Sequence, residues 1–185
     1  MTIAAVVLAA GGGTRWDGGG HKLLADLGGR PLAAHAIDAA AASGLDELVV
    51  VTGAADLSDV IPDSATVLYN PDWEAGQAVS LQLAVEHCRS VGHEAIVVGL
   101  ADTPGIPAAA WQAVAEQSAD LVCATFDGRR RPPVKVAAHL WDELPVTGDV
   151  GARLLLRWRA SEAVEVACDG EPADVDTLKD LSAWS

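Results

Sequence analysis

Cysteine is scarce in this sequence. The 185 residues include three cysteines, Cys88, Cys123 and Cys168, which are far apart and form no CxxC motif. The odd number and the wide spacing argue against a disulfide framework or a structural zinc site, and they fit a reducing compartment. We therefore expect a cytoplasmic protein in which the three thiols are small, buried, apolar side chains.

Positive charge is also scarce. Twelve Lys and Arg stand against 26 Asp and Glu, which gives a formal net charge of −14. A protein that binds long nucleic acid normally presents a basic face, so nucleic acid is not expected as a partner. A small phosphorylated ligand remains compatible with this charge if the few cations cluster. They partly do so in the sequence: Arg15 and Lys22 flank the N-terminal loop, and a second group consists of Arg129, Arg130, Arg131 and Lys135.

Long hydrophobic runs are absent. The apolar stretch 3–10 ends in glycines, is too short to cross a bilayer, and follows no basic segment of the kind that begins a secretory signal. We expect a buried strand there and no membrane partner. Aromatic residues make up 4% of the chain, and much of its hydrophobic half is alanine, which indicates a compact, helix-rich protein.

Apolar, β-branched runs alternate with alanine-rich stretches along the chain. Continuous apolar runs indicate strands covered on both faces, and their alternation with helices indicates a mostly parallel sheet between two helical layers. In such folds ligands bind beyond the carboxyl ends of the strands. The expected strands are 3–9, 47–52, 66–69, 95–100, 121–125, 134–137 and 163–167. The expected helices are 31–43, 79–89, 108–117, 151–158 and 177–184.

The loop after the first expected strand reads LAAGGGTR over 8–15 and continues to Lys22. Glycines after a buried strand let the backbone approach a ligand and point N–H groups at an anion. Arg15 can bind phosphate oxygens through its forked guanidinium, and Lys22 adds a compact cation. The loop is not a dinucleotide-binding GxGxxG, because Trp16 occupies the third glycine position, and it lacks the Lys-Ser or Lys-Thr pair of a P-loop. His21, beside Lys22, is the one histidine that merits a test.

This loop resembles that of the molybdenum-cofactor nucleotidyltransferase family, within the wider sugar-nucleotide pyrophosphorylase-like fold. Members carry LAAGxGTR, a spacer and a lysine, and KLL at 22–24 with GRPL at 29–32 is similar to the continuation in the molybdopterin branch. The resemblance implies a three-layer α/β/α, Rossmann-like nucleotidyltransferase fold with a mostly parallel mixed sheet. It implies that Arg15 and Lys22 neutralise the β- and γ-phosphates of an NTP. It also implies nucleotide binding by the loop at Leu8, Ala9, Ala10, Gly11, Gly12 and Gly13.

Asp102 stands at the carboxyl end of the expected strand 95–100, in the segment LADTP. From position alone, a helix cap or a plain turn explains it as well as a site does. The family's Leu-Ala-Asp-x-Pro signature implies that Asp102 holds Mg²⁺, an ion that suits carboxylates, waters and substrate phosphates. The family's DIDTPEDL ending implies Asp174 as a second ligand, with Asp176 as the alternative. The same acidic cluster would also serve as a cap for the last helix.

The segment 70–81, NPDWEAGQAVSL, resembles the family's NPxWxxGxxxSL. The resemblance implies that this segment forms a base and ribose pocket together with the end of strand 47–52. Trp73 either covers that pocket or packs in the core. The residues expected to bind the nucleotide here are Thr52, Asn70, Gly76 and Ser80.

The segment 148–153, GDVGAR, resembles GDxGAR of the molybdopterin cytidylyl and guanylyl transferases. It implies contacts to the acceptor's phosphate and pterin at a turn that begins a helix. The run 129–131 and the proline after it replace the family's Gly-His-Pro-Val-like stretch, so the arginines are either an acceptor contact or a solvated hairpin tip. The expected acceptor-binding residues are Asp149, Gly151 and Arg153.

These resemblances follow the family's order over nearly the whole chain and imply a Mg²⁺-dependent nucleotidyltransferase. The expected reaction is CMP transfer from CTP to a molybdopterin-type molybdenum cofactor, with release of pyrophosphate. Guanylyl transfer, a sugar-phosphate or phospholactate acceptor, and a non-catalytic nucleotide or cofactor chaperone are the alternatives. We expect one domain over 1–185, with the nucleotide bound by about 1–105 and the acceptor by about 106–185. We also expect a monomer whose protein partner is a molybdenum hydroxylase or its chaperone.

Overall fold

The computed structural model describes residues 1–184 and contains a seven-stranded sheet and a small two-stranded one. The strands β5, β4, β1 and β6 pair in parallel, as do β7 and β9, whereas β8 is antiparallel to both of its neighbours. The mostly parallel mixed sheet expected from the sequence is confirmed. The spatial order is β5 (Thr66–Tyr69), β4 (Glu47–Thr52), β1 (Ile3–Ala9), β6 (Ala95–Leu100), β8 (Arg129–Ala137), β7 (Leu121–Phe126) and β9 (Val164–Ala167).

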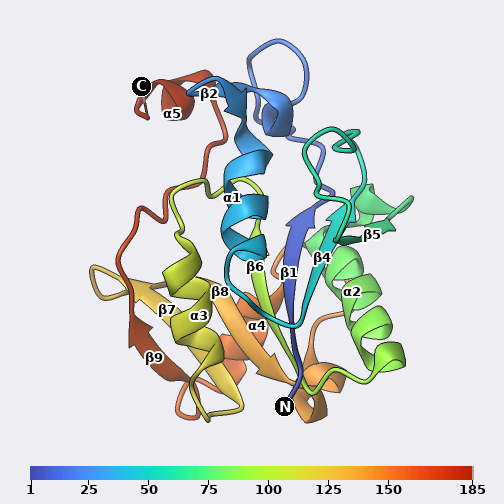
Figure 1. Ribbon diagram of the computed structural model, residues 1–185, viewed down its shortest axis with the longest axis vertical. Helices are drawn as coiled ribbons and strands as arrows, with labels where there is room; N and C mark the ends of the chain where they lie inside the picture. Colours follow the sequence, from blue (N-terminus) through green and yellow to red (C-terminus); the bar gives the residue numbers. More distant parts are fainter. Residues whose placement is uncertain (185) are drawn as a thin grey trace.

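Helices cover both faces of the large sheet. One face packs against α1 (Leu32–Ala41) and α3 (Ala108–Ala115), which stand in front of the sheet in Figure 1. The other face packs against α2 (Gln77–Val91), α4 (Ala152–Trp158) and a 3-10 segment (Ala138–Glu143). A fifth helix, α5 (Leu178–Ser182), lies beside the hairpin of β2 (Asp26–Leu27) and β3 (Arg30–Pro31). The α/β/α layering predicted from the alternating pattern is therefore confirmed.

The central strand β1 is buried along its whole length, which explains its unbroken apolar sequence. Successive side chains point to opposite faces of a strand, so Val7 packs with Ile37 of α1 while Val6 packs with Leu81 of α2. A shift of β1 by one residue would move the side chains of each core to the opposite face of the sheet. The two cores therefore fix the register of β1 against its neighbours.

That register positions the site. Leu8 of β1 pairs with Leu100 of β6, and the amide of Ala101 donates to the Leu8 carbonyl over 3.1 Å. The glycine loop after β1 and the loop after β6 therefore leave the sheet side by side. Both leave at the carboxyl ends of the strands, where parallel sheets bind their ligands.

The predicted strands 3–9, 47–52, 66–69 and 95–100 are confirmed at both ends. The strand predicted at 134–137 begins earlier in the structure, at Arg129. The prediction started it after the two prolines, because proline is disfavoured inside a strand. In the structure β8 carries these prolines at an irregularity in its pairing with β7, between Arg131 and Val134. Pairing of β8 with β6 begins at Val134, so neither proline has to donate to a ladder.

The cysteines are free thiols, as predicted. Cys88 and Cys123 are buried, and Cys168 is partly buried. Burial raises the pKa of Cys88 to about 12 and that of Cys123 to about 11, so both stay protonated and act as apolar side chains. Among residues 1–184, none of the helices combines the length and the apolar character that crossing a bilayer requires.

Candidate active site

Lys22 reaches the site from a short 3-10 turn, Lys22–Leu24, and His21 holds this turn in place. The Leu23 amide donates to His21 Nδ1 over 3.2 Å, while His21 Nε2 lies 3.0 Å from the Gly11 carbonyl. These two partners require the neutral ring with its proton on Nε2. Burial, reinforced by the charge of Lys22, lowers the pKa of His21 despite the hydrogen bond to Gly11, which agrees with a neutral ring. His21 therefore positions the glycine loop.

The Lys22 ammonium bridges two carboxylates. Its Nζ donates to Asp102 Oδ2 over 2.7 Å and to Asp176 Oδ1 over 2.9 Å. Arg15 Nη1 lies 2.8 Å from the other carboxylate oxygen of Asp176, Oδ2. Burial alone would lower the pKa of Lys22, but the charges and hydrogen bonds of the two aspartates outweigh it and raise the pKa. Lys22 is therefore a charged, nearly buried cation at the junction of three loops.

Lys22 and Asp102 open onto one hollow of about 610 Å³, which we call the nucleotide pocket. The glycine loop, the start of α2 and the loop after β6 form its walls. The structure gathers here most of the residues that the sequence analysis singled out. These are Leu8, Ala9, Ala10, Gly11, Gly12, Gly13, Arg15, Lys22, Gly76, Ser80, Asp102 and Asp149.

The carboxylate that joins Asp102 beside Lys22 is Asp176, which the sequence analysis gave as the alternative to Asp174. Asp174 is exposed and does not line the pocket, whereas Asp176 is buried and does. The Val175 amide donates to the Asp102 carbonyl over 2.9 Å, which fixes the extended segment beside the loop after β6. Side chains at i and i+2 share one face of a regular extended segment, so alternation does not separate Asp174 from Asp176. The contacts of Asp176 with Lys22 and Arg15 distinguish the two.

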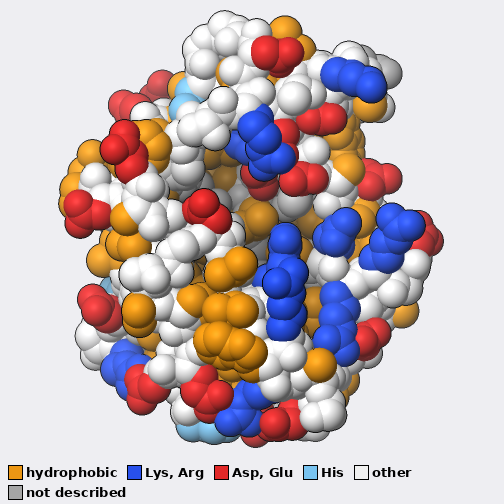
Figure 2. Space-filling model, turned by 180° about the vertical axis from the view of Figure 1, so that it is seen from behind, with side chains coloured by type: hydrophobic (Ala, Val, Ile, Leu, Met, Phe, Trp, Pro, Cys, Tyr) orange, Lys and Arg blue, Asp and Glu red, His pale blue; other side chains and the backbone are white. Residues whose placement is uncertain are grey.

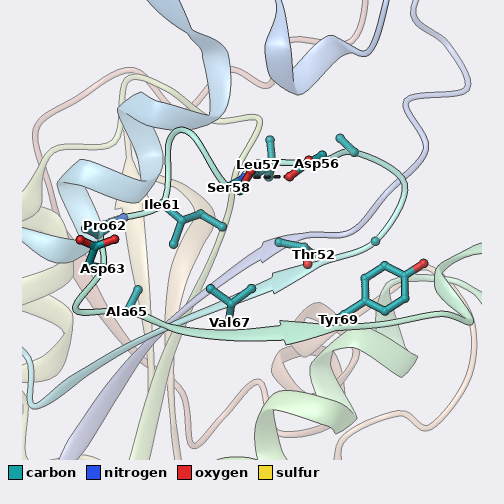
Figure 3. Close-up of a pocket in the computed structure, with 12 residues that line it drawn as sticks. Thr52, Asp56, Leu57, Ser58, Ile61, Pro62, Asp63, Ala65, Val67 and Tyr69 are labelled. Atoms are coloured by element: carbon teal, nitrogen blue, oxygen red, sulfur yellow. Dashed lines mark hydrogen bonds between the residues drawn. The ribbon is translucent and has the colours of Figure 1, made fainter.

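Two other expected nucleotide-binding residues lie outside the nucleotide pocket. Thr52 lines a separate hollow of about 470 Å³ between β5 and the loop after β4, and Figure 3 shows it there together with Leu57 and Tyr69. Asn70 is buried behind the wall, where its Nδ2 donates to Ser80 Oγ over 2.9 Å. Asn70 therefore orients Ser80 and does not face the pocket itself.

Gly76 joins the start of α2 to the turn at 148–149. Its φ of 108° lies in the region that favours glycine, and a Cβ there would lie 2.7 Å from the Gly148 carbonyl oxygen. The Gln77 amide next to it donates to Asp149 Oδ1 over 3.3 Å. Asp149 thus caps the first turn of α2 at the rim of the nucleotide pocket.

Trp73 both lines the nucleotide pocket and packs against the glycine loop. A Cβ on Gly12 would lie 2.5 Å from the Trp73 ring, and a Cβ on Gly53 would lie 2.8 Å from Trp73 Cβ. The two roles considered for this tryptophan therefore coexist. Gly12 is required by a close approach of an aromatic ring, a reason that the sequence motif alone does not reveal.

The donor set of the nucleotide pocket fits a divalent cation. Asp102 Oδ1 is buried and has no hydrogen-bond partner within residues 1–184, so this oxygen is open to a ligand. Asp102 and Asp176 already approach one cation, the Lys22 ammonium. The described residues contain no cluster of three or more His, Cys, Asp or Glu able to hold a metal. Asp102 and Asp176 would supply two carboxylates to such an ion, and hard divalent cations can complete their shell with waters and substrate phosphates.

A second hollow of about 330 Å³ adjoins the nucleotide pocket and shares Leu8, Gln77 and Leu100 with it. We call it the arginine pocket, because its lining includes Arg130, Arg131, Arg153 and Arg157. Figure 2, which views the molecule from the α4 side, shows Lys and Arg side chains grouped around a hollow.

The sequence analysis anticipated part of this second hollow. Arg153 lines the arginine pocket, and Gly151 forms the turn before α4, with φ 47° and the Gln77 side chain packed against it. Arg157 was missed. It lies four residues after Arg153 on a helix, a spacing that places both side chains on one face and is visible in the sequence.

Comparison with known proteins supports a nucleotide-transferring fold. The chain is 41% identical over 108 residues to the Bifunctional protein GlmU of Caulobacter vibrioides, an alignment that covers 55% of this chain and 22% of that protein. It is 28% identical over 195 residues to the Nicotine blue oxidoreductase of Paenarthrobacter nicotinovorans, covering 97% of this chain and 94% of that protein. The structure of Rv0371C from Mycobacterium tuberculosis in complex with manganese superposes with a TM-score of 0.84 at 24% identity, covering 100% and 98% of the two chains.

The domain match agrees with the site. Residues 5–165 match the MobA-like NTP transferase domain, and this range includes the glycine loop, Lys22 and Asp102. The chain spans only about a quarter or less of the GlmU proteins, 22% and 26% of two of them, so their further activities have no counterpart in this alignment. The fold, the glycine loop and the match over most of the chain together identify this protein as a member of the MobA-like NTP transferase domain family.

Proposed function

We propose that this protein transfers CMP from CTP to a molybdopterin-type molybdenum cofactor, using Mg²⁺ and releasing pyrophosphate. The observation that carries the proposal is the convergence of Lys22, Asp102 and Asp176 in a glycine-walled pocket at the carboxyl ends of parallel strands. An acidic pair that is already bridged by a cation suits a site that binds a metal-bound triphosphate.

In the proposed reaction, an oxygen of the acceptor's phosphate attacks the α-phosphorus of the NTP. A new P–O bond forms there while the bond to the β-phosphate oxygen breaks, and pyrophosphate leaves with that electron pair. The attacking phosphate is already anionic, so no side chain has to remove a proton. Positioning and the stabilisation of developing negative charge are the main tasks of the protein.

Named residues supply these tasks. The glycine loop lets backbone amides approach the triphosphate, and Arg15 and Lys22 donate to the oxygens that gain charge as pyrophosphate leaves. Asp102 and Asp176 would hold Mg²⁺, which when bound polarises the α-phosphate. Lys22 then exchanges its two carboxylate partners for phosphate oxygens, so it remains paired throughout.

The base and the acceptor are the finer part of the proposal. We favour CTP on the resemblance of 70–81 and 148–153 to the molybdopterin branch of the family, and GTP is the alternative because guanylyl transferases share the motif at 148–153. Asp149 lines the nucleotide pocket and Arg153 lines the neighbouring arginine pocket, and we assign both of them, together with Gly151, to acceptor binding. The manganese bound in the Rv0371C structure supports a divalent ion here. A protein partner would be a molybdenum hydroxylase or its chaperone, which receives the product.

Pyrophosphate release tests the proposal. The protein is incubated with Mg²⁺, a molybdopterin acceptor and either CTP or GTP. A parallel sample contains NADPH, to detect the redox activity that the name of the similar Nicotine blue oxidoreductase suggests. We expect release with CTP and acceptor together. Tight CTP binding without release under any acceptor would contradict the proposal and favour a nucleotide-binding chaperone.

Two matched variants link that activity to the site. We expect Asp102→Asn to lower kcat by a factor of about 10²–10³, the range found when one group that stabilises transition-state charge is removed. Asp174→Asn serves as the control, because Asp174 is exposed and does not line the nucleotide pocket. A fully active Asp102→Asn enzyme would remove the basis of the proposed mechanism.

A further inference from the structure

The arginine pocket has an electrostatic character unlike the rest of the molecule. The chain carries a net charge of −14, yet four of its 12 Lys and Arg line this one hollow. No Asp or Glu is among its lining residues. Such a concentration of one sign in an acidic protein creates a local positive field that attracts anions.

Most of these guanidiniums have no carboxylate partner among the residues that the structure describes. Arg130 Nε donates to Glu165 Oε1 over 2.7 Å. Arg131, Arg153 and Arg157 take part in none of the ion pairs within residues 1–184. Cations that share a hollow repel one another, and an anionic ligand that accepts hydrogen bonds from them relieves this repulsion.

Part of the lining of the arginine pocket is apolar, and we call it the apolar wall. Val98 and Val134 of the sheet and Leu156 of α4 line it, all of them buried. A site with apolar walls and a few convergent charged groups binds molecules that have both an apolar body and a polar group. The hollow also adjoins the nucleotide pocket, with which it shares Leu8 and Leu100.

We propose that the arginine pocket binds the acceptor, and that this acceptor is an organic phosphate ester whose ring or hydrocarbon body packs on the apolar wall. Its anionic oxygens bind Arg131 and Arg157, which makes these two residues determinants of acceptor specificity. The inference rests on the proposed function, because it assigns the second substrate of that transfer. A neutral molecule of the same shape gains no charge-assisted hydrogen bond from these guanidiniums and should therefore bind more weakly.

Equilibrium binding of benzyl phosphate tests this assignment, with benzyl alcohol as the neutral molecule of similar shape. The protein is first saturated with Mg²⁺ and an α,β-methylene analogue of CTP, which occupies the nucleotide pocket and cannot transfer its nucleotide. Arg131→Gln, Arg157→Gln and the double variant are compared with Arg129→Gln. Arg129 is the matched control, since it is an exposed arginine of β8 that does not line the pocket.

We expect benzyl phosphate to bind the double variant at least about tenfold more weakly than the unaltered protein or Arg129→Gln. Benzyl alcohol should bind weakly to all of them. Equal binding of benzyl phosphate to the double variant and to Arg129→Gln, or equal binding of the alcohol and the phosphate, overturns the inference. Titration of the CTP analogue is read separately: if no form of the protein binds the analogue, the proposed function fails, while the comparison of arginine variants still decides the role of the pocket.

Discussion

Replacing Lys22 by methionine removes the ammonium that bridges Asp102 and Asp176 and keeps the side chain near its original length. Two charge-assisted hydrogen bonds are lost, at 2.7 and 2.9 Å, and two carboxylates then face each other. Removing one partner of a fully buried ion pair costs about 3–5 kcal/mol. The side chains of Asp102 and Asp176 are 21% and 12% exposed, and Arg15 still pairs with Asp176, so part of the charge stays solvated or compensated.

We therefore expect Lys22→Met to lower the free energy of unfolding by about 2–4 kcal/mol. For a chain of this length, that corresponds to a decrease in Tm of about 5–15 °C. Calorimetry and urea unfolding measure both quantities. Lys179→Met is the control, because Lys179 is exposed and its side chain has no carboxylate partner within residues 1–184.

The same variant tests the cation site. Without the ammonium, Asp102 and Asp176 attract a divalent ion more strongly, so Mg²⁺ should raise the Tm of Lys22→Met more than that of the unaltered protein. A chelator should abolish the difference. If Lys22→Met unfolds within about 1 °C of the Lys179→Met control and does not respond to Mg²⁺, the carboxylates are not held together by Lys22 and our account of the site is wrong.

Three further predictions concern the supports of the site. Gly12→Ala should cost about 1–3 kcal/mol of stability in urea unfolding, because the new Cβ overlaps the Trp73 ring, whereas Gly11→Ala meets open space and should cost less than about 0.5 kcal/mol. Burial lowers the pKa of His21, so the stability that the neutral ring contributes is fully present above the ordinary pKa of 6.5 and is lost as the pH falls below it. The urea midpoint should therefore decline less between about pH 8 and pH 5 in His21→Asn than in the unaltered protein. Burial would raise the pKa of Glu47, but hydrogen bonds from three neighbouring side chains outweigh it and lower the pKa. Glu47→Gln should therefore lower the urea midpoint at neutral pH, and the difference from the unaltered protein should vanish as the pH falls below 4.5.

The sequence by itself determined the central sheet and the two sides of the nucleotide pocket. Buried parallel strands must be apolar on both faces, so β1, β4 and β6 stand out as continuous runs with clear ends. A glycine loop after one such strand and Asp102 after another must then lie at the same edge, because parallel strands end on the same side. The sequence pattern of these segments was therefore sufficient to predict the strands and the edge of the sheet at which the glycine loop and Asp102 lie.

Only the tertiary structure decided between residues that look alike in the sequence. Asp174 and Asp176 are both acidic residues before a helix, and contacts with Lys22 and Arg15, which are distant in the sequence, single out Asp176. Thr52 is the last residue of β4, and Asp102 closely follows the end of β6, yet Thr52 lines the separate hollow beside β5. The direction of a side chain depends on contacts between distant segments, and the spacing of residues along one segment does not contain that information.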